Sequence, residues 1–129
     1  MVIADSSVWI TFLREPASTI GTELAGLVRS SDVAITGVIL AEVLQGARSD
    51  REFNRLREDL EAIPCFDASI EVWVRAADLR RRMRALGQTV AMTDLSIAAI
   101  AQIEDAEIFT SDTDFARIPG IRLYQEGIS

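Results

Sequence analysis

The chain has 129 residues, of which 49% are hydrophobic, and it carries a formal net charge of −7 at pH 7. A chain of this length can bury one core but not two, so we expect a single domain over residues 1–129. Cys65 is the only cysteine, which excludes an intrachain disulfide. No signal-peptide pattern and no apolar run long enough to span a bilayer is present, so we expect a soluble cytoplasmic protein.

The chain contains no histidine and no lysine, and all 13 of its basic residues are arginines. Without histidine there is no Ser-His-Asp or Cys-His pair, and no imidazole for metal-free RNA cleavage. Without lysine there is no Schiff base and no P-loop lysine. The acidic net charge argues against a nucleic-acid partner, unless several acids converge on a cation that reverses the local charge. The chemistry left to an enzyme is that of carboxylates, hydroxyls and a bound metal ion.

In chain order, the first half alternates short apolar strands with helices. The pattern predicts strands over 2–4 and 33–35 and helices over 8–13, 20–28 and 38–44, with a further helix between Ser49 and Pro64. Thr36 is expected to cap the third helix, which stops near Gly46. Ser49 and Glu52 form a capping-box signature for the fourth.

The second half continues the alternation, with predicted strands over 63–66, 107–110 and 121–124 and helices over 70–86 and 95–103. We expect Trp73, Ala77 and Met83 to face inward and Thr93 to cap the last helix. Strands separated by helices, and not by tight turns, indicate the α/β class. The predicted fold is a three-layer α/β/α sandwich with a central, mostly parallel sheet.

Acidic residues follow two of the predicted strands. Asp5 comes directly after the first strand, and Asp112 and Asp114 follow the strand that ends at Thr110. Ligands of open parallel sheets bind beyond the carboxyl ends of the strands, so these acids are candidates for one site. The structural alternatives are that Asp5 only caps a helix and that Asp112 and Asp114 only occupy a turn.

Two further acids stand in apolar helices. Nearly every neighbour of Glu42 is apolar, so a carboxylate that points inward there needs partners or a metal; the alternative is an incidental surface residue. Asp94 heads another apolar helix, where the helix dipole alone also explains a negative charge. The conjunction matters, because the purely structural explanations must all hold together in a chain with no other plausible catalytic groups.

The sequence resembles a PIN domain, and more narrowly the VapC-type toxin of a VapBC toxin–antitoxin pair. The resemblance rests on four segments in the family's order, Val2–Ser7, Thr36–Gly46, Asp94–Ala101 and Thr110–Phe115. It implies a PIN-like fold and an endoribonuclease that depends on Mg²⁺ or Mn²⁺ and acts on structured RNA. It also implies inhibition by a cognate VapB-like antitoxin, through an Arg-rich tail that reaches the carboxylates, and a homodimer.

The resemblance also implies roles for the acids. Asp5, Asp94 and Asp112 would bind the metal, and Glu42 would complete its ligands or orient the attacking water. Asp112 and Asp114 compete for the fourth acidic position, and we take Asp112 as primary with Asp114 in support. Two hydroxyls, those of Ser7 and Thr110, would hydrogen-bond these carboxylates or act as local caps.

Two groups of arginines are concentrated in the helices, one at 80–84 and a looser one at 48–57. They contact phosphates, or else they stay solvated or pair with neighbours such as Asp78 and Glu58.

Two other functions compete with the nuclease. A Mg²⁺-dependent phosphotransfer domain needs a lysine, or a second acid in the position that Ser7 occupies, and the chain has neither. A non-catalytic PIN-like interaction module, which docks an Arg-rich partner peptide, keeps the acids but cleaves no RNA.

Overall fold

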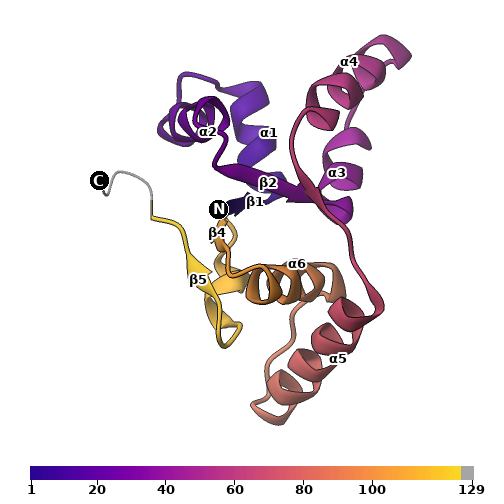
Figure 1. Cartoon of the computed structure of the whole chain (residues 1–129), viewed down its shortest axis with the longest axis vertical. Helices are drawn as coiled ribbons and strands as arrows, with labels where there is room; N and C mark the ends of the chain where they lie inside the picture. Colours follow the sequence, from indigo (N-terminus) through magenta and orange to yellow (C-terminus); the bar gives the residue numbers. More distant parts are fainter. Residues whose placement is uncertain (126–129) are drawn as a thin grey trace.

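The computed structural model describes residues 1–125, so residues 126–129 of the expected domain lie outside the described residues. Helices and strands follow one another in the predicted alternation (Figure 1), as β1 (Val2–Ala4), α1 (Ser6–Arg14), α2 (Thr19–Arg29), β2 (Val33–Thr36), α3 (Gly37–Leu44), α4 (Asp50–Glu61), β3 (Cys65–Phe66), α5 (Ile70–Ala85), α6 (Met92–Ile103), β4 (Glu107–Phe109), the 3-10 helix η1 (Thr113–Arg117) and β5 (Arg122–Leu123). The strands predicted over 63–66 and 121–124 are shorter than expected, and η1 was not predicted.

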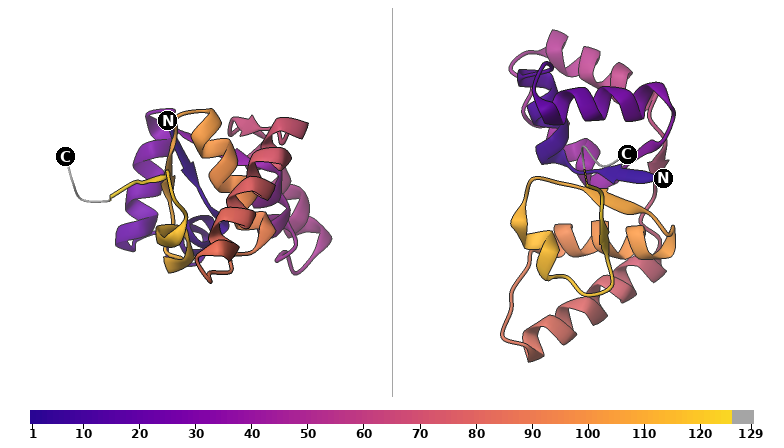
Figure 2. Two further views of the ribbon diagram at one scale, coloured as in Figure 1. Left: turned by 90° about the horizontal axis from the view of Figure 1, so that it is seen from below. Right: turned by 90° about the vertical axis from the view of Figure 1, so that its left-hand side faces the viewer.

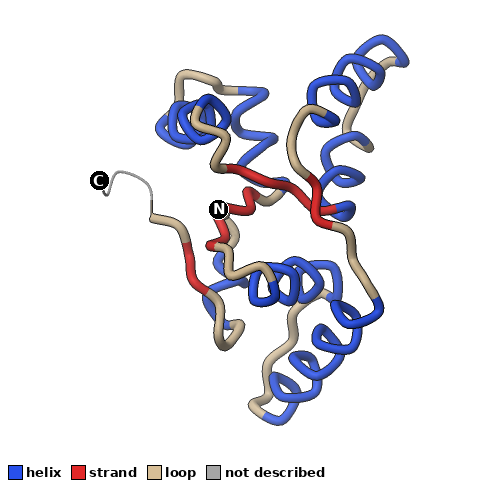
Figure 3. Tube along the Cα trace, viewed as in Figure 1, coloured by secondary structure: helices blue, strands red, loops and turns tan. Residues whose placement is uncertain are grey.

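The strands form one sheet in the order β3-β2-β1-β4-β5, and every pairing is parallel. Residues of β1, β2 and β4 are almost all buried, as expected for strands that are covered on both faces. The prediction of a mostly parallel central sheet is confirmed. The strands lie together at the centre of the molecule, with helices around them (Figure 3).

The helices cover both faces of the sheet. The helices α1, α2 and α4 lie on one side and α5 and α6 on the other (Figure 2), which confirms the three-layer arrangement. Within residues 1–125, no helix is long and apolar enough to cross a membrane.

The strand order places a topological switch between β1 and β4. From β1 the chain moves outward through β2 to β3, and it then returns through α5 and α6 to β4, on the other side of β1. Ala4 pairs with Phe109, so the residues after both strands meet at the same edge of the sheet. A switch point of this kind opens a crevice at the carboxyl ends of the strands.

Two local predictions about α5 and α6 were wrong. Trp73 is 42% exposed and Ala77 is also exposed, although Met83 is buried as expected. The buried face of α5 begins one residue earlier than predicted and consists of Val72, Ala76, Leu79 and Met83. These residues have helical spacing, and their side chains are smaller than Trp73, which suits close packing against the alanine-rich α6.

Thr93 does not cap α6. The helix begins at Met92, and its N-cap residue, Ala91, makes no side-chain capping bond. The preceding segment is held by a tertiary contact instead, because an Nη1 of Arg80 donates to the Val90 carbonyl at 2.7 Å. The earlier start places Asp94 at the third position of the helix, inside the first turn.

Candidate active site

Asp5 is the most deeply buried acid of the site, with 5% of its surface exposed. Its carboxylate accepts bonds from the Ser7 hydroxyl at 2.5 Å, the Thr110 hydroxyl at 2.6 Å and the Val8 amide at 3.3 Å. Burial raises its pKa above the ordinary value, although these hydrogen bonds oppose the change. Asp5 is therefore both the N-cap of α1 and a carboxylate at the end of β1, so the two interpretations do not exclude each other.

The segment after β4 is organised around the same hydroxyls. The Ser111 amide donates to the Ser7 hydroxyl at 3.2 Å, and the Asp112 amide donates to the Thr110 hydroxyl at 2.9 Å. An oxygen of Asp112 in turn accepts from the Asp114 amide at 2.9 Å and caps η1. Each hydroxyl thus joins Asp5 to the backbone of this turn, and the turn brings Asp112 toward the end of β1.

Glu42 projects from α3 and is half-buried. One of its carboxylate oxygens accepts a hydrogen bond from the Ser6 hydroxyl at 3.3 Å. Ser6 was not identified from the sequence, because a serine in the first turn of a helix has an ordinary capping explanation. The bond leaves the second oxygen of Glu42 available to a ligand.

The negative charges of the other four acids act on Asp94. Burial, followed by the charges of its acidic neighbours, raises its pKa from 3.8 to about 6; in decreasing order these neighbours are Asp112, Glu42, Asp5 and Asp114. A helix N-terminus favours the charged form by only about 0.3–1 kcal/mol, so burial and repulsion outweigh the dipole here. The charges of all of the sequence-predicted acids therefore act on Asp94, although Asp5 and Glu42 are not in the group whose carboxylate oxygens lie within 4.8 Å of one another.

Asp114 differs from the other acids in having a basic partner. One of its oxygens pairs with an Nη2 of Arg117, and the same guanidinium lies 3.5 Å from the Thr89 carbonyl. A cation at that oxygen would have to compete with the guanidinium. Arg117 was missed at the sequence level, because its distance from Asp114 depends on the unpredicted η1.

The site offers only oxygen ligands. Carboxylate oxygens of Asp94, Asp112 and Asp114 lie within 4.8 Å of one another. Opposite ligands of an octahedral Mg²⁺ are separated by about 4 Å, so a small inward movement of the side chains would suffice to hold such an ion. Carboxylate oxygens are ligands that suit a hard divalent cation. The charge of such a cation would relieve the repulsion that helps to raise the pKa of Asp94.

Comparison with known proteins agrees with this architecture. The PIN domain family profile matches residues 2–121. The chain is 30% identical to "VapC ribonuclease Mb1587" of Mycobacterium bovis over 129 residues, which covers 95% of this chain and 96% of the relative. The chain belongs to the PIN domain family, among its VapC ribonucleases. It is also 33% identical to "Ribonuclease VapC5" of Mycobacterium tuberculosis over 127 residues, covering 92% of this chain and 87% of the relative.

Solved structures show the same fold at lower sequence identity. The DNA-bound VapBC of Salmonella typhimurium superimposes with a TM-score of 0.82 at 21% identity, over 95% of this chain and 96% of that one. VapBC2 of Rickettsia felis, bound to a promoter DNA fragment, gives a TM-score of 0.81 at 22% identity, over 96% and 98% of the two chains. These likenesses support the arrangement of the sheet and its helices.

The raised pKa of Asp94 predicts how the metal-free protein responds to pH. Its folded pKa of about 6 exceeds the ordinary value of 3.8, so stability is greatest while Asp94 is protonated and falls as pH rises through 6. The neutral Asp94→Asn variant should escape this loss. In EDTA at pH 7.5 we expect its Tm to exceed that of the wild type by roughly 4 °C, which corresponds to about 1 kcal/mol after solvent screening.

Differential scanning fluorimetry from pH 4.5 to 7.5 tests this expectation. The difference should be smaller at pH 4.5, where the Asp94 carboxyl is neutral in the folded wild type but still largely ionised in the unfolded chain, and it would vanish only below pH 3.8. Glu58→Gln, which removes one exposed charge elsewhere, is the matched control and should leave the pH dependence unchanged. Equal melting temperatures of Asp94→Asn and wild type at pH 7.5 would contradict the repulsion described here.

Proposed function

We propose that this chain is a metal-dependent endoribonuclease toxin that hydrolyses RNA phosphodiester bonds and is held inactive by a cognate VapB-like antitoxin. The observation that carries the proposal is the convergence of four carboxylates on Asp94 near the carboxyl ends of β1 and β4. Its membership of the VapC ribonucleases supports the reaction type.

The acidic residues would have different roles in the reaction. Asp5, Asp94 and Asp112 would hold Mg²⁺ or Mn²⁺, with Asp114 in support. When bound, the cation would offset the charge of the scissile phosphate and lower the pKa of a water molecule. Glu42 would orient that water through its free carboxylate oxygen and take its proton as the water adds to phosphorus and a bridging P–O bond breaks.

Hydroxyl groups fix these carboxylates in place. Ser6 holds one oxygen of Glu42, and Ser7 and Thr110 hold the two oxygens of Asp5. Because the donors come from α1 and from the end of β4, they also fix the position of α1 relative to the sheet. Such supporting hydrogen bonds orient the ligands of a metal and stabilise their charged form.

The acidic site also accounts for the proposed antitoxin. The VapBC structures with a similar fold contain toxin and antitoxin together. An arginine from a partner segment would meet several carboxylates and relieve the same repulsion that a cation relieves. The homodimer that the family resemblance implies belongs to the same proposal and is testable by light scattering.

Divalent cations should stabilise the protein through the site. At a Mn²⁺ concentration of 100 times the dissociation constant, the gain is about 2.7 kcal/mol, which thermal denaturation would detect. Asp112→Asn should lose most of this gain, because asparagine preserves the cap of η1 but removes the charge. Glu58→Gln should behave as the wild type does. No Mn²⁺-dependent shift in the wild type would contradict the metal site.

Cleavage should depend on the same acids. We expect Glu42→Gln, Asp94→Asn and Asp112→Asn to slow the Mg²⁺-dependent cleavage of a labelled RNA stem-loop by at least about 100-fold, or ~2.7 kcal/mol of activation free energy. Asp114→Asn should cost less than about 10-fold, because Arg117 already neutralises Asp114. Equal cleavage by wild type and Asp94→Asn would indicate a contaminating nuclease and favour the non-catalytic interaction module.

Expression in a bacterial host tests the toxin–antitoxin assignment. The wild type should arrest growth, and co-expression of a small DNA-binding protein with a basic tail, encoded by the neighbouring reading frame, should restore it. Asp94→Asn should not arrest growth at equal protein levels. Growth arrest that persists in this variant would show that toxicity does not come from the carboxylate site.

A further inference from the structure

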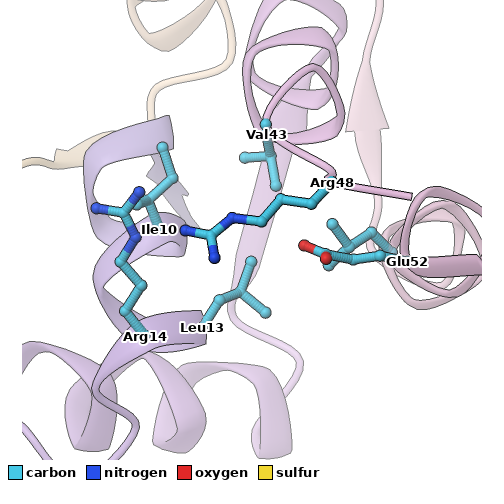
Figure 4. Close-up of a pocket in the computed structure, with 8 residues that line it drawn as sticks. Ile10, Leu13, Arg14, Val43, Arg48 and Glu52 are labelled. Atoms are coloured by element: carbon cyan, nitrogen blue, oxygen red, sulfur yellow. The ribbon is translucent and has the colours of Figure 1, made fainter. Parts of the chain in front are cut away.

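A pocket near the carboxylates carries more basic than acidic side chains. It has a volume of about 280 Å³ and lies between α1 and the segment that joins α3 to α4. Three charged residues, Arg14, Arg48 and Glu52, line it together with apolar ones, which are Ile10, Leu13, Val43 and Leu56. In Figure 4 the guanidinium of Arg48 extends across the pocket toward that of Arg14.

The same helices that carry the active site also form this pocket. Ile10 lies one turn along α1 from Ser6, the residue that bonds to Glu42, and Val43 is the next residue after Glu42 in α3. With a rise of 1.5 Å per residue, Arg14 lies about 12 Å along the helix axis from Ser6. The pocket is thus within a few nucleotides of the carboxylates, since a nucleic-acid strand advances about 3.4 Å per phosphate.

The two arginines have no ion pair or hydrogen bond with any other side chain among residues 1–125. Several other basic residues are neutralised, because Arg81 and Arg82 both pair with Asp78 and Arg57 pairs with Glu61. Two guanidinium groups without an ion pair that line the same pocket form an anion-binding arrangement.

We propose that Arg14 and Arg48 bind a backbone phosphate of the RNA substrate, one that flanks the phosphate cleaved at the carboxylates. This inference rests on the proposed ribonuclease function and specifies how such an acidic protein holds its substrate. The guanidinium fork matches the geometry of phosphate oxygens, and neither exposed guanidinium has to break an ion pair in order to bind one. An acidic peptide would offer the same charges, but the position of the pocket next to the cleavage site favours RNA.

Glu52 provides an internal check, because its carboxylate also lines the pocket and lies on the Arg48 side (Figure 4). Its negative charge would repel a phosphate held by the arginines. Removing this charge should therefore change the RNA affinity in the opposite direction from removing an arginine. Only its backbone amide takes part in capping α4, so Glu52→Gln preserves that bond to Ser49.

Binding of a fluorescein-labelled RNA stem-loop, measured by anisotropy over a salt series, tests the proposal. All proteins carry Asp94→Asn to prevent cleavage. The Arg14→Gln/Arg48→Gln double variant should bind about 10-fold more weakly. Its slope of log affinity against log salt concentration should be shallower by about 0.7, as for one lost phosphate contact. Glu52→Gln should bind more tightly. Arg57→Gln, which removes one positive charge from α4 outside the pocket, is the control and should leave affinity and slope unchanged.

The outcomes separate this inference from the proposed function. If the wild-type protein cleaves RNA, but the double variant and Arg57→Gln bind RNA with the same affinity and the same salt slope, the phosphate pocket is overturned and the proposed function is not. Unchanged RNA affinity with weaker binding of a labelled hexaglutamate peptide would also overturn it and indicate an acidic peptide. If the wild type neither binds nor cleaves RNA, both the inference and the proposed function fail. Circular dichroism and Tm values equal to those of the control show that the double variant is folded.

Discussion

The parallel pairing of β1 with β4 is the contact on which the site depends. Ala4 lies opposite Phe109, and the Asp5 amide continues the ladder by donating to the Phe109 carbonyl at 3.0 Å. Everything beyond this pair follows from its register, because the next residues on the two strands are Asp5 and Thr110. A slip of one residue would turn the Asp5 side chain to the other face of the sheet and separate it from the Thr110 hydroxyl.

The site combines a stable framework with an unfavourable electrostatic arrangement. Hydroxyls and amides hold Asp5 and Asp112 in fixed positions, while burial and mutual repulsion raise the pKa of Asp94. Rigid hydrogen bonds keep the carboxylates together despite this repulsion. A site of this kind gains free energy from any cation of the right size and charge, whether a metal ion or a guanidinium, and this accounts for both catalysis and inhibition in one proposal.

Sequence patterns predicted most of the fold, because the strands and helices differ clearly in hydrophobic period and because several caps lie at the expected residues. The acids were found from their positions after strands and in apolar helices. Errors arose where tertiary contacts decide between equivalent local patterns. The stripe of α5 shifted by one residue, from Trp73 to Val72, and α6 began before Thr93. Contacts such as those of Ser6 and Arg117 depend on the folded geometry, which no local pattern contains.

The hydrogen bond between Thr110 and Asp5 joins residues that are 105 positions apart in the chain. During synthesis the ribosome completes β1, α1 and α3 long before β4 emerges, and Asp94 and Asp112 also come late. A nascent or truncated chain that ends before β4 therefore has Asp5 and Glu42 but lacks the strand that closes the site. In a protein whose activity would harm its own cell, this order of assembly postpones the harmful chemistry until almost the whole chain has been made and a partner can already bind.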